Sequence, residues 1–195
     1  RNHRKICVVD GKVGFTGGLN IADEYINAKH PYGYWKDNAI MLEGKGVYSL
    51  TLMFLSMWES LDDPKMQKKN PLDYGKFFPK EIKFDCGEGI VQPYTDNPLD
   101  TNPVGESIYL NMIYSAVRYV WIMVPYLIID HNMEQALCNA AKSGVDVRII
   151  VPGIPDKKLI YEATKSSYGV LLDAGVFKRD GEGQAAFDRF VDSIK

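Results

Sequence analysis

The sequence predicts an α/β protein in which a mixed β-sheet is flanked by helices on both faces. Near the N-terminus, two short β-prone runs surround an Asp-Gly pair, which is typical of a hairpin. In the second half, two near-continuous apolar strands (residues 120–127 and 145–151) are joined by a helix, as in a parallel βαβ unit. The chain has 195 residues and is 46% hydrophobic, enough for one good-sized domain or two small ones.

The first half begins with the predicted hairpin, in which strands 6–9 and 13–16 are separated by Asp10-Gly11-Lys12. Glycine accepts a positive φ without steric cost, so Asp-Gly suits such a turn. Gly17 and Gly18 then allow a tight backbone path. After that path we expect a short helix over 21–27, a strand over 38–43 and an apolar helix over 47–61.

The composition changes between residues 62 and 103, where six of the ten prolines fall. Proline interrupts helices and central strands, so we expect a long surface connection here. Two short strands, near residues 82–86 and 90–94, are predicted within it.

The second half alternates helices and strands. Asp130 is a predicted N-cap for the helix that connects the two apolar strands, and Ser143-Gly144 is its predicted stop. The helices are expected over residues 104–118, 131–142 and 157–173. The predicted organisation is therefore 1–61, a connecting segment 62–103, a βαβ region 104–176, and a tail 177–195 to which the sequence assigns no function.

Charge and cysteine content restrict the class of partner. With 23 basic and 25 acidic residues the formal net charge is −2, so no global field favours nucleic acid. The three cysteines are far apart and lack metal-ligand spacing, which favours a reduced, cytoplasmic-facing environment and predicts no metal site. The longest apolar stretch, 119–129, is too short for a membrane-spanning helix, so we expect this chain itself to be soluble.

The residues that carry chemistry lie at the start of the chain, where His3, Lys5 and Asp10 form the pattern His-x-Lys-x4-Asp. On an extended chain His3 and Lys5 project from one face, about 6.5–7 Å apart at the backbone. An imidazole that can attack phosphorus would then lie beside an ammonium that can hold phosphate oxygens. Taken singly, each residue has an ordinary explanation: solvated surface for His3 and Lys5, a hairpin turn for Asp10. Their joint occurrence with Gly17-Gly18-Leu19-Asn20 favours a functional site.

These motifs resemble the signature of the phospholipase D superfamily. The wider run through Ile21-Ala22-Asp23-Glu24-Tyr25 and Gly33-Tyr34-Trp35-Lys36-Asp37 is similar to bacterial cardiolipin synthases. Later segments agree with the part of that family that precedes its second motif, namely Val124-Pro125-Tyr126, residues 140–147, and Val151-Pro152-Gly153 with Asp156. The resemblance covers about residues 1–176 and implies a phospholipase D-like fold.

The resemblance also implies roles for individual residues. His3 corresponds to one of two paired histidines, of which one attacks phosphorus and the other protonates the leaving alcohol; we expect His3 to be the nucleophile. Lys5 and Asn20 would bind the non-bridging oxygens, and Asp10 would support the motif. Asp37 is the expected carboxylate that orients His3, with Glu24 and Asp23 as weaker candidates. Thr16 could add a hydroxyl to the substrate-binding pocket, although an ordinary strand position explains it as well.

In this family the motif occurs twice and both copies meet in one active site, whereas this sequence has one His-x-Lys. We therefore expect the chain to be a central fragment, inactive by itself, of a phosphatidyltransferase that joins two phosphatidylglycerols into cardiolipin without a cofactor. The implied partners are that phospholipid substrate and, through the parent protein, the surface of the bacterial cell membrane. Alternatives are a phosphodiesterase or nuclease of the same superfamily and an inert folded fragment.

Two further expectations concern association and lipid contact. An active isolated chain would imply a homodimer that pairs two single motifs. The Met and aromatic stripe within residues 47–58 is expected to be core, with a lipid-facing groove as the alternative.

Overall fold

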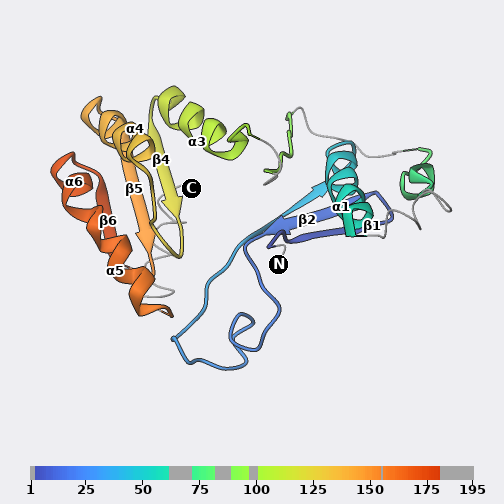
Figure 1. Ribbon diagram of the computed structural model, residues 1–195, viewed down its shortest axis with the longest axis horizontal. Coiled ribbons are helices and arrows are strands. Elements are labelled where there is room, and N and C mark those ends of the chain that lie inside the picture. The colour runs from blue at the N-terminus through green and yellow to red at the C-terminus, as the bar shows by residue number, and fades with distance from the viewer. Residues whose placement is uncertain (1–2, 62–71, 82–88, 97–100, 155, 181–195) are drawn as a thin grey trace. The chain divides into compact units, whose positions relative to one another are not determined.

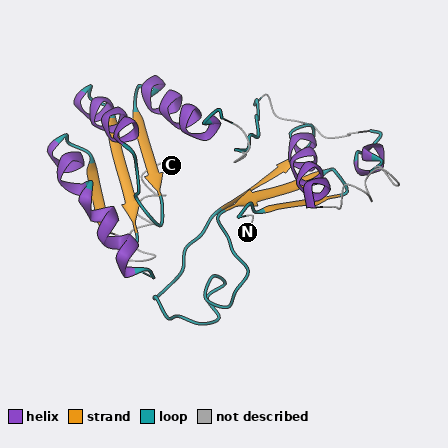
Figure 2. Cartoon of the chain, viewed as in Figure 1, coloured by secondary structure: helices purple, strands orange, loops and turns teal. Residues whose placement is uncertain are grey.

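The computed structural model describes residues 3–61, 72–81, 89–96, 101–154 and 156–180. Its contacts divide the chain into two compact units: unit 1 combines residues 1–21 with 37–97, and unit 2 combines residues 22–36 with 98–195. Each unit contains a three-stranded sheet with helices, so the predicted α/β class is confirmed (Figure 1). The described strands form one antiparallel and one parallel sheet rather than the single mixed sheet that was predicted. Figure 2 shows the two sheets and the long loop that leaves the first sheet and returns to it.

Unit 1 is built on an antiparallel sheet with the order β1-β2-β3. Its strands are β1 (Ile6–Val9), β2 (Val13–Gly17) and β3 (Ala39–Glu43). The predicted hairpin between β1 and β2 is confirmed: Asp10 and Gly11 adopt φ values of 54° and 64°, and the Lys12 amide donates to the Val9 carbonyl at 3.0 Å. Two successive residues at positive φ twist the turn in the sense that antiparallel strands require.

Helix α1 (Val47–Leu61) packs on one face of this sheet, with Val47, Leu50 and Leu55 buried. A Cβ on Gly14 of β2 would lie 2.9 Å from Cδ1 of Leu50. The absence of a side chain at Gly14 therefore lets the helix approach the strand closely. The expectation that the Met and aromatic stripe of α1 is core is wrong for its aromatic residues. Tyr48, Phe54 and Trp58 are 52%, 37% and 54% exposed, and the core contribution of the helix comes from its aliphatic residues.

Unit 2 contains a parallel sheet with the order β4-β5-β6. Its strands are β4 (Tyr119–Met123), β5 (Asp146–Val151) and β6 (Phe177–Asp180). Helix α4 (His131–Lys142) joins β4 to β5, and α5 (Lys158–Ser166) and α6 (Tyr168–Asp173) join β5 to β6; α3 (Val104–Ser115) precedes β4 and contacts α4. The parallel βαβ unit predicted from the apolar runs is confirmed.

Alternation along β5 shows where the core of unit 2 lies. Val147, Ile149 and Val151 are buried together with Leu137 of α4, whereas Asp146, Arg148 and Ile150 are only half-buried. The helices therefore cover the Val147 face of the strand.

The ends of α4 follow the predicted signals. Asp130 has an extended backbone and its Oδ1 accepts the Met133 amide at 2.9 Å, which satisfies one of the free N–H groups of the first turn. At the other end Gly144 adopts φ +90° and allows the chain to turn into β5.

Three predicted elements differ in the structure. Residues 21–27 form turns rather than a helix, because Asn27 has φ +59° and its side chain pairs with the backbone of Trp35. The single helix expected over 157–173 is two helices, since the Ser167 amide bonds the Lys165 carbonyl and interrupts the helical pattern. Residues 90–94 form no strand; Pro93 lacks the amide that a ladder needs.

Two other predictions fall at the limits of the described residues. The strand expected near residues 82–86 lies outside them. Residues 177–180, the start of the predicted tail, form β6, which pairs in parallel with β5, so this sheet extends beyond Val176. The remainder of the tail lies outside the described residues.

Candidate active site

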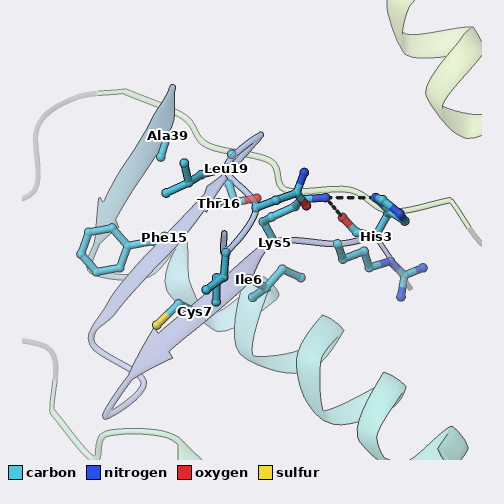
Figure 3. Close-up of a pocket in the computed structure, with 12 residues that line it drawn as sticks. His3, Lys5, Ile6, Cys7, Phe15, Thr16, Leu19 and Ala39 are labelled. Atoms are coloured by element: carbon cyan, nitrogen blue, oxygen red, sulfur yellow. Dashed lines mark hydrogen bonds between the residues drawn. The ribbon is translucent and has the colours of Figure 1, made fainter. Parts of the chain in front are cut away.

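His3 and Lys5 lie in extended chain directly before β1, and their side chains meet as the spacing predicts. The Nζ of Lys5 lies 3.2 Å from Nδ1 of His3 and donates to the His3 carbonyl oxygen at 2.7 Å (Figure 3). An ammonium carries three protons, so one donor of Lys5 remains for a substrate oxygen. The imidazole and a cation that can bind phosphate are thus neighbours.

The contact with Lys5 influences which nitrogen of a neutral His3 carries the proton. An ammonium is only a donor, so this contact favours the tautomer in which Nδ1 accepts and Nε2 carries the proton. Attack through Nε2 requires the opposite tautomer, with Nδ1–H held by an acceptor such as a carboxylate. The site therefore contains both groups but holds the histidine in the resting tautomer.

Arg4 lies between His3 and Lys5 in the sequence, but its side chain points to another segment of the chain. Its Nη2 donates to the carbonyl oxygen of Asp96 at 2.6 Å, across 92 positions of the sequence. This bond ties the start of the motif to a distant segment of unit 1.

An open hollow of about 680 Å³ adjoins the motif, and its walls are largely apolar. Phe15, Leu19 and Ile21 stay substantially exposed to solvent within it. Figure 3 shows Phe15 and Leu19 among the residues that line the hollow together with Lys5 and His3. The residues that line the hollow are His3, Arg4, Lys5, Ile6, Cys7, Phe15, Thr16, Gly17, Leu19, Asn20, Ile21 and Ala39.

The glycine turn brings Asp37 close to this region. The Gly18 amide donates to the Asn38 carbonyl at 3.1 Å, and a Cβ on Gly18 would collide with Oδ1 of Asp37. Glycine at position 18 therefore leaves room for the carboxylate. Asp37 Oδ1 accepts the Asn38 amide at 2.9 Å, and among the described residues no hydrogen bond joins Asp37 to His3. The orienting role of Asp37 stays a prediction.

Of the other expected site residues, two line the hollow and one lies away from it. Thr16 and Asn20 line the hollow, together with His3 and Lys5. Asp10 lies in the hairpin turn at the opposite end of β1, exposed and at positive φ, and is not part of the lining. The structure thus brings four of the predicted residues to one hollow and places Asp10 in a turn. Their roles in catalysis stay predictions.

A second polar pair lies in unit 2, beyond the carboxyl ends of β4 and β5. The Tyr126 hydroxyl donates to Oδ2 of Asp156 at 2.6 Å, and Nζ of Lys157 lies 5.4 Å from the centre of the Tyr126 ring. Burial and then the hydrogen bond to Asp156 raise the pKa of Tyr126 to about 12. Sequence reasoning found these residues only as parts of a family pattern. Their positions directly after two parallel strands were the signal that they would meet.

No group of three or more His, Cys, Asp or Glu side chains is arranged to hold a metal ion in the part of the chain that the structure describes. Within those same residues, no helix is both long and apolar enough to cross a membrane.

Comparison with known proteins supports the resemblance seen in the motifs. Residues 109–183 match a family model described as "Cardiolipin synthase, PLD-like domain". The matched stretch contains the β4-α4-β5 unit and most of the rest of the described part of unit 2. The similarity to the phospholipase D superfamily, predicted from the sequence, is confirmed.

Comparison with individual proteins shows which members of the superfamily the chain is similar to. The chain is 40% identical to a cardiolipin synthase of Alkalihalophilus pseudofirmus and 42% identical to one of a Geobacillus species. A protein of Streptococcus mutans described as uncharacterized is 49% identical. Each match covers 90% of this chain, which spans about a third of the length of these relatives (34–37%). The chain is therefore similar to bacterial cardiolipin synthases.

Proposed function

We propose that this chain supplies the first histidine of a phosphatidyltransferase that makes cardiolipin and releases glycerol. The observation that carries the proposal is the contact between Nζ of Lys5 and Nδ1 of His3 beside an apolar hollow. Cleavage of a phosphodiester bond needs a nucleophile and a cation that binds the phosphate oxygens, and a site for a lipid also needs apolar walls. Phe15, Leu19 and Ile21 supply such walls.

The proposed reaction proceeds in two displacements. First, Nε2 of His3 attacks the phosphorus of one phosphatidylglycerol; a P–N bond forms and the P–O bond to the headgroup glycerol breaks. A second histidine, outside this chain, gives its proton to the leaving glycerol and then takes one from the incoming alcohol. The hydroxyl of a second phosphatidylglycerol attacks phosphorus, the P–N bond breaks, and cardiolipin leaves. Lys5 and Asn20 hold the non-bridging oxygens throughout.

His3 must change its hydrogen-bond partner for the first step. Nδ1 faces Lys5 in the resting arrangement, whereas attack by Nε2 needs a carboxylate at Nδ1–H. We propose that Asp37, which lies beside the glycine turn, takes this position when substrate draws the Lys5 ammonium to a phosphate oxygen.

The test uses the longer protein that contains this chain, supplied with phosphatidylglycerol labelled in its headgroup. We expect cardiolipin and glycerol in equal amounts, and we expect His3→Asn to lower turnover by about 10³-fold or more. His131→Asn is the matched control, because His131 lies exposed on the first turn of α4 and its loss should leave turnover unchanged. Undiminished activity of His3→Asn would refute the assignment, and cleavage of DNA in place of lipid would favour the nuclease alternative.

The isolated chain is expected to be inactive. It contains three histidines, of which only His3 is followed at the second position by lysine. One such motif provides either the nucleophile or the proton donor, not both. Turnover by the isolated chain that rises with the square of its concentration would contradict this expectation and would indicate a homodimer that pairs two motifs.

A further inference from the structure

Exposed aromatic, aliphatic and basic side chains gather on unit 2 where the loop 22–36 lies against the segments that follow β4 and β5. Ile154 marks the contact, since its Cδ1 lies 3.5 Å from the position a Cβ would take on Gly33. We refer to the following residues as the loop surface: Tyr32, Tyr34, Ile154, Lys157, Lys158 and Leu159.

Hydrogen bonds and ring contacts hold this loop in place. The side chain of Asn27 pairs with both the amide and the carbonyl of Trp35, at 2.6 and 2.8 Å. The Trp35 ring contacts Tyr25 at 4.8 Å and Tyr32 at 6.4 Å between centroids. The side chains of Tyr32 and Tyr34 therefore extend from a loop that these contacts hold in one conformation.

The apolar members of the loop surface are open to water. The exposed fractions of Leu159, Ile154 and Tyr34 are 88%, 59% and 56%. Two aliphatic side chains this exposed on the segment after β5, with the tyrosines of the adjoining loop, indicate a surface that is covered by a partner.

Charge distinguishes between the kinds of partner. Within the described residues, Lys157 and Lys158 have no carboxylate partner, although Lys157 lies over the ring of Tyr126. Asp23 pairs with Lys29, whereas Asp156 accepts only the neutral Tyr126 hydroxyl and keeps its charge, so the two lysines exceed this carboxylate by one charge. The loop surface therefore presents net positive charge. Protein–protein interfaces are depleted in lysine, whereas lysine and tyrosine beside exposed aliphatic residues are typical of the interface between membrane and water.

We propose that the loop surface docks unit 2 onto a bilayer of anionic phospholipid. Ile154 and Leu159 enter the headgroup region, the tyrosine rings lie at its level, and Lys157 and Lys158 face lipid phosphates. The proposal builds on the proposed lipid substrate, but it concerns adsorption to the membrane rather than turnover.

The experiment measures co-sedimentation of the 195-residue chain with phosphatidylglycerol vesicles and with phosphatidylcholine vesicles at about 0.1 M salt. We expect binding to the anionic vesicles. Replacing both lysines (Lys157→Gln with Lys158→Gln) should weaken it about 25-fold, about fivefold for each charge. Replacing the aliphatic pair (Ile154→Ser with Leu159→Ser) should weaken it about tenfold.

A control places one change of each kind, aliphatic to serine and lysine to glutamine, at the opposite end of the strands. Val117 is 86% exposed before the amino end of β4, and Lys142 is exposed before the amino end of β5. The pair Val117→Ser with Lys142→Gln should leave vesicle binding unchanged. Circular dichroism of every variant establishes that it is folded.

The remaining outcomes separate this proposal from the alternatives and from the proposed function. Equal losses in the control and in the loop-surface variants, or no binding to anionic vesicles, would overturn the docking surface. A dimer in light scattering that both loop-surface variants abolish would show that a second copy covers it instead. His3→Asn should bind vesicles normally, because the docking surface does not include the motif. A longer protein with His3 intact that binds vesicles but makes no cardiolipin would refute the proposed function and leave the docking surface standing.

Discussion

The ammonium of Lys5 contacts His3 at two acceptors, the carbonyl oxygen at 2.7 Å and Nδ1 at 3.2 Å. Because an ammonium cannot accept, the contact at Nδ1 favours the neutral ring with its proton on Nε2. Lys5 therefore has a second role besides binding a phosphate oxygen, because its contact at Nδ1 favours one tautomer of the neighbouring histidine.

The first prediction concerns this tautomer. Lys5→Met removes the donor at Nδ1, so the share of the His3 tautomer with its proton on Nε2 should fall to that of a histidine free in water. Long-range proton–nitrogen spectra at about pH 9, where imidazole is neutral, distinguish the two tautomers by the shifts of their ring nitrogens. His131 gives an internal reference in the same spectrum. A His3 tautomer ratio that is unchanged by Lys5→Met would mean that the contact at Nδ1 does not form in solution.

A second prediction concerns pH and the stability of unit 2. Arg148 donates to Asp146 through Nε at 2.9 Å, and Trp121 donates to the same carboxylate at 3.2 Å. The bond from Arg148 and then that from Trp121 hold the pKa of Asp146 below 3.8, although partial burial opposes them. Because the folded-state pKa is depressed, this stabilisation is complete above about pH 4 and is lost as the pH falls through the folded-state value.

Asp146→Asn should therefore lower the melting temperature at about pH 7 and have little effect at about pH 2. The loss is at most about 1 kcal/mol, because both side chains are substantially exposed. Glu162→Gln is the control, since Glu162 forms an exposed pair with Lys165 within α5 and should contribute less at either pH. A deficit of Asp146→Asn that persists undiminished at about pH 2 would exclude the carboxylate charge as its cause.

The sequence could predict the elements whose signals are local. Asp10-Gly11 between two apolar runs predicted the hairpin, and Asp130 with Gly144 predicted both ends of α4. The helix expected over residues 21–27 was wrong because its outcome depends on Trp35, eight positions beyond Asn27. No local pattern reports such a pairing.

The candidate site also contains features that the sequence could predict and features that it could not. The meeting of His3 with Lys5 followed from strand geometry, since residues two apart share a face. The apolar walls from Phe15 and Leu19 did not, because they depend on the register of β1 with β2 and on the path of the glycine turn. Tertiary packing, rather than propensity, determines that path.

A third prediction separates backbone strain from steric collision at two glycines. Gly11 and Gly144 both have positive φ, but a Cβ on Gly11 would collide with the Phe77 carbonyl, whereas nothing lies within 4 Å of one on Gly144. Gly144→Ala should cost about 1–2 kcal/mol, the strain of a left-handed residue. Gly11→Ala should cost about 1–3 kcal/mol more, because the backbone near Phe77 must also move. Urea denaturation measures both, and equal losses would mean that Phe77 does not pack against the hairpin.

The last prediction concerns a buried hydroxyl that joins α5 to the segment after β4. Thr164 is 1% exposed; its Oγ1 accepts the Leu127 amide at 3.2 Å and donates to the Ile160 carbonyl at 3.1 Å. Thr164→Val keeps the shape but leaves the Leu127 amide without its acceptor, so it should cost about 1–3 kcal/mol of unfolding free energy. Thr164→Ser keeps the hydroxyl and loses one methyl group, so it should cost about 0.8 kcal/mol. Amide hydrogen exchange at Leu127 should accelerate in Thr164→Val and remain slow in Thr164→Ser. If serine proved the more damaging replacement, packing of the methyl group rather than the hydrogen bond would hold α5 against this segment.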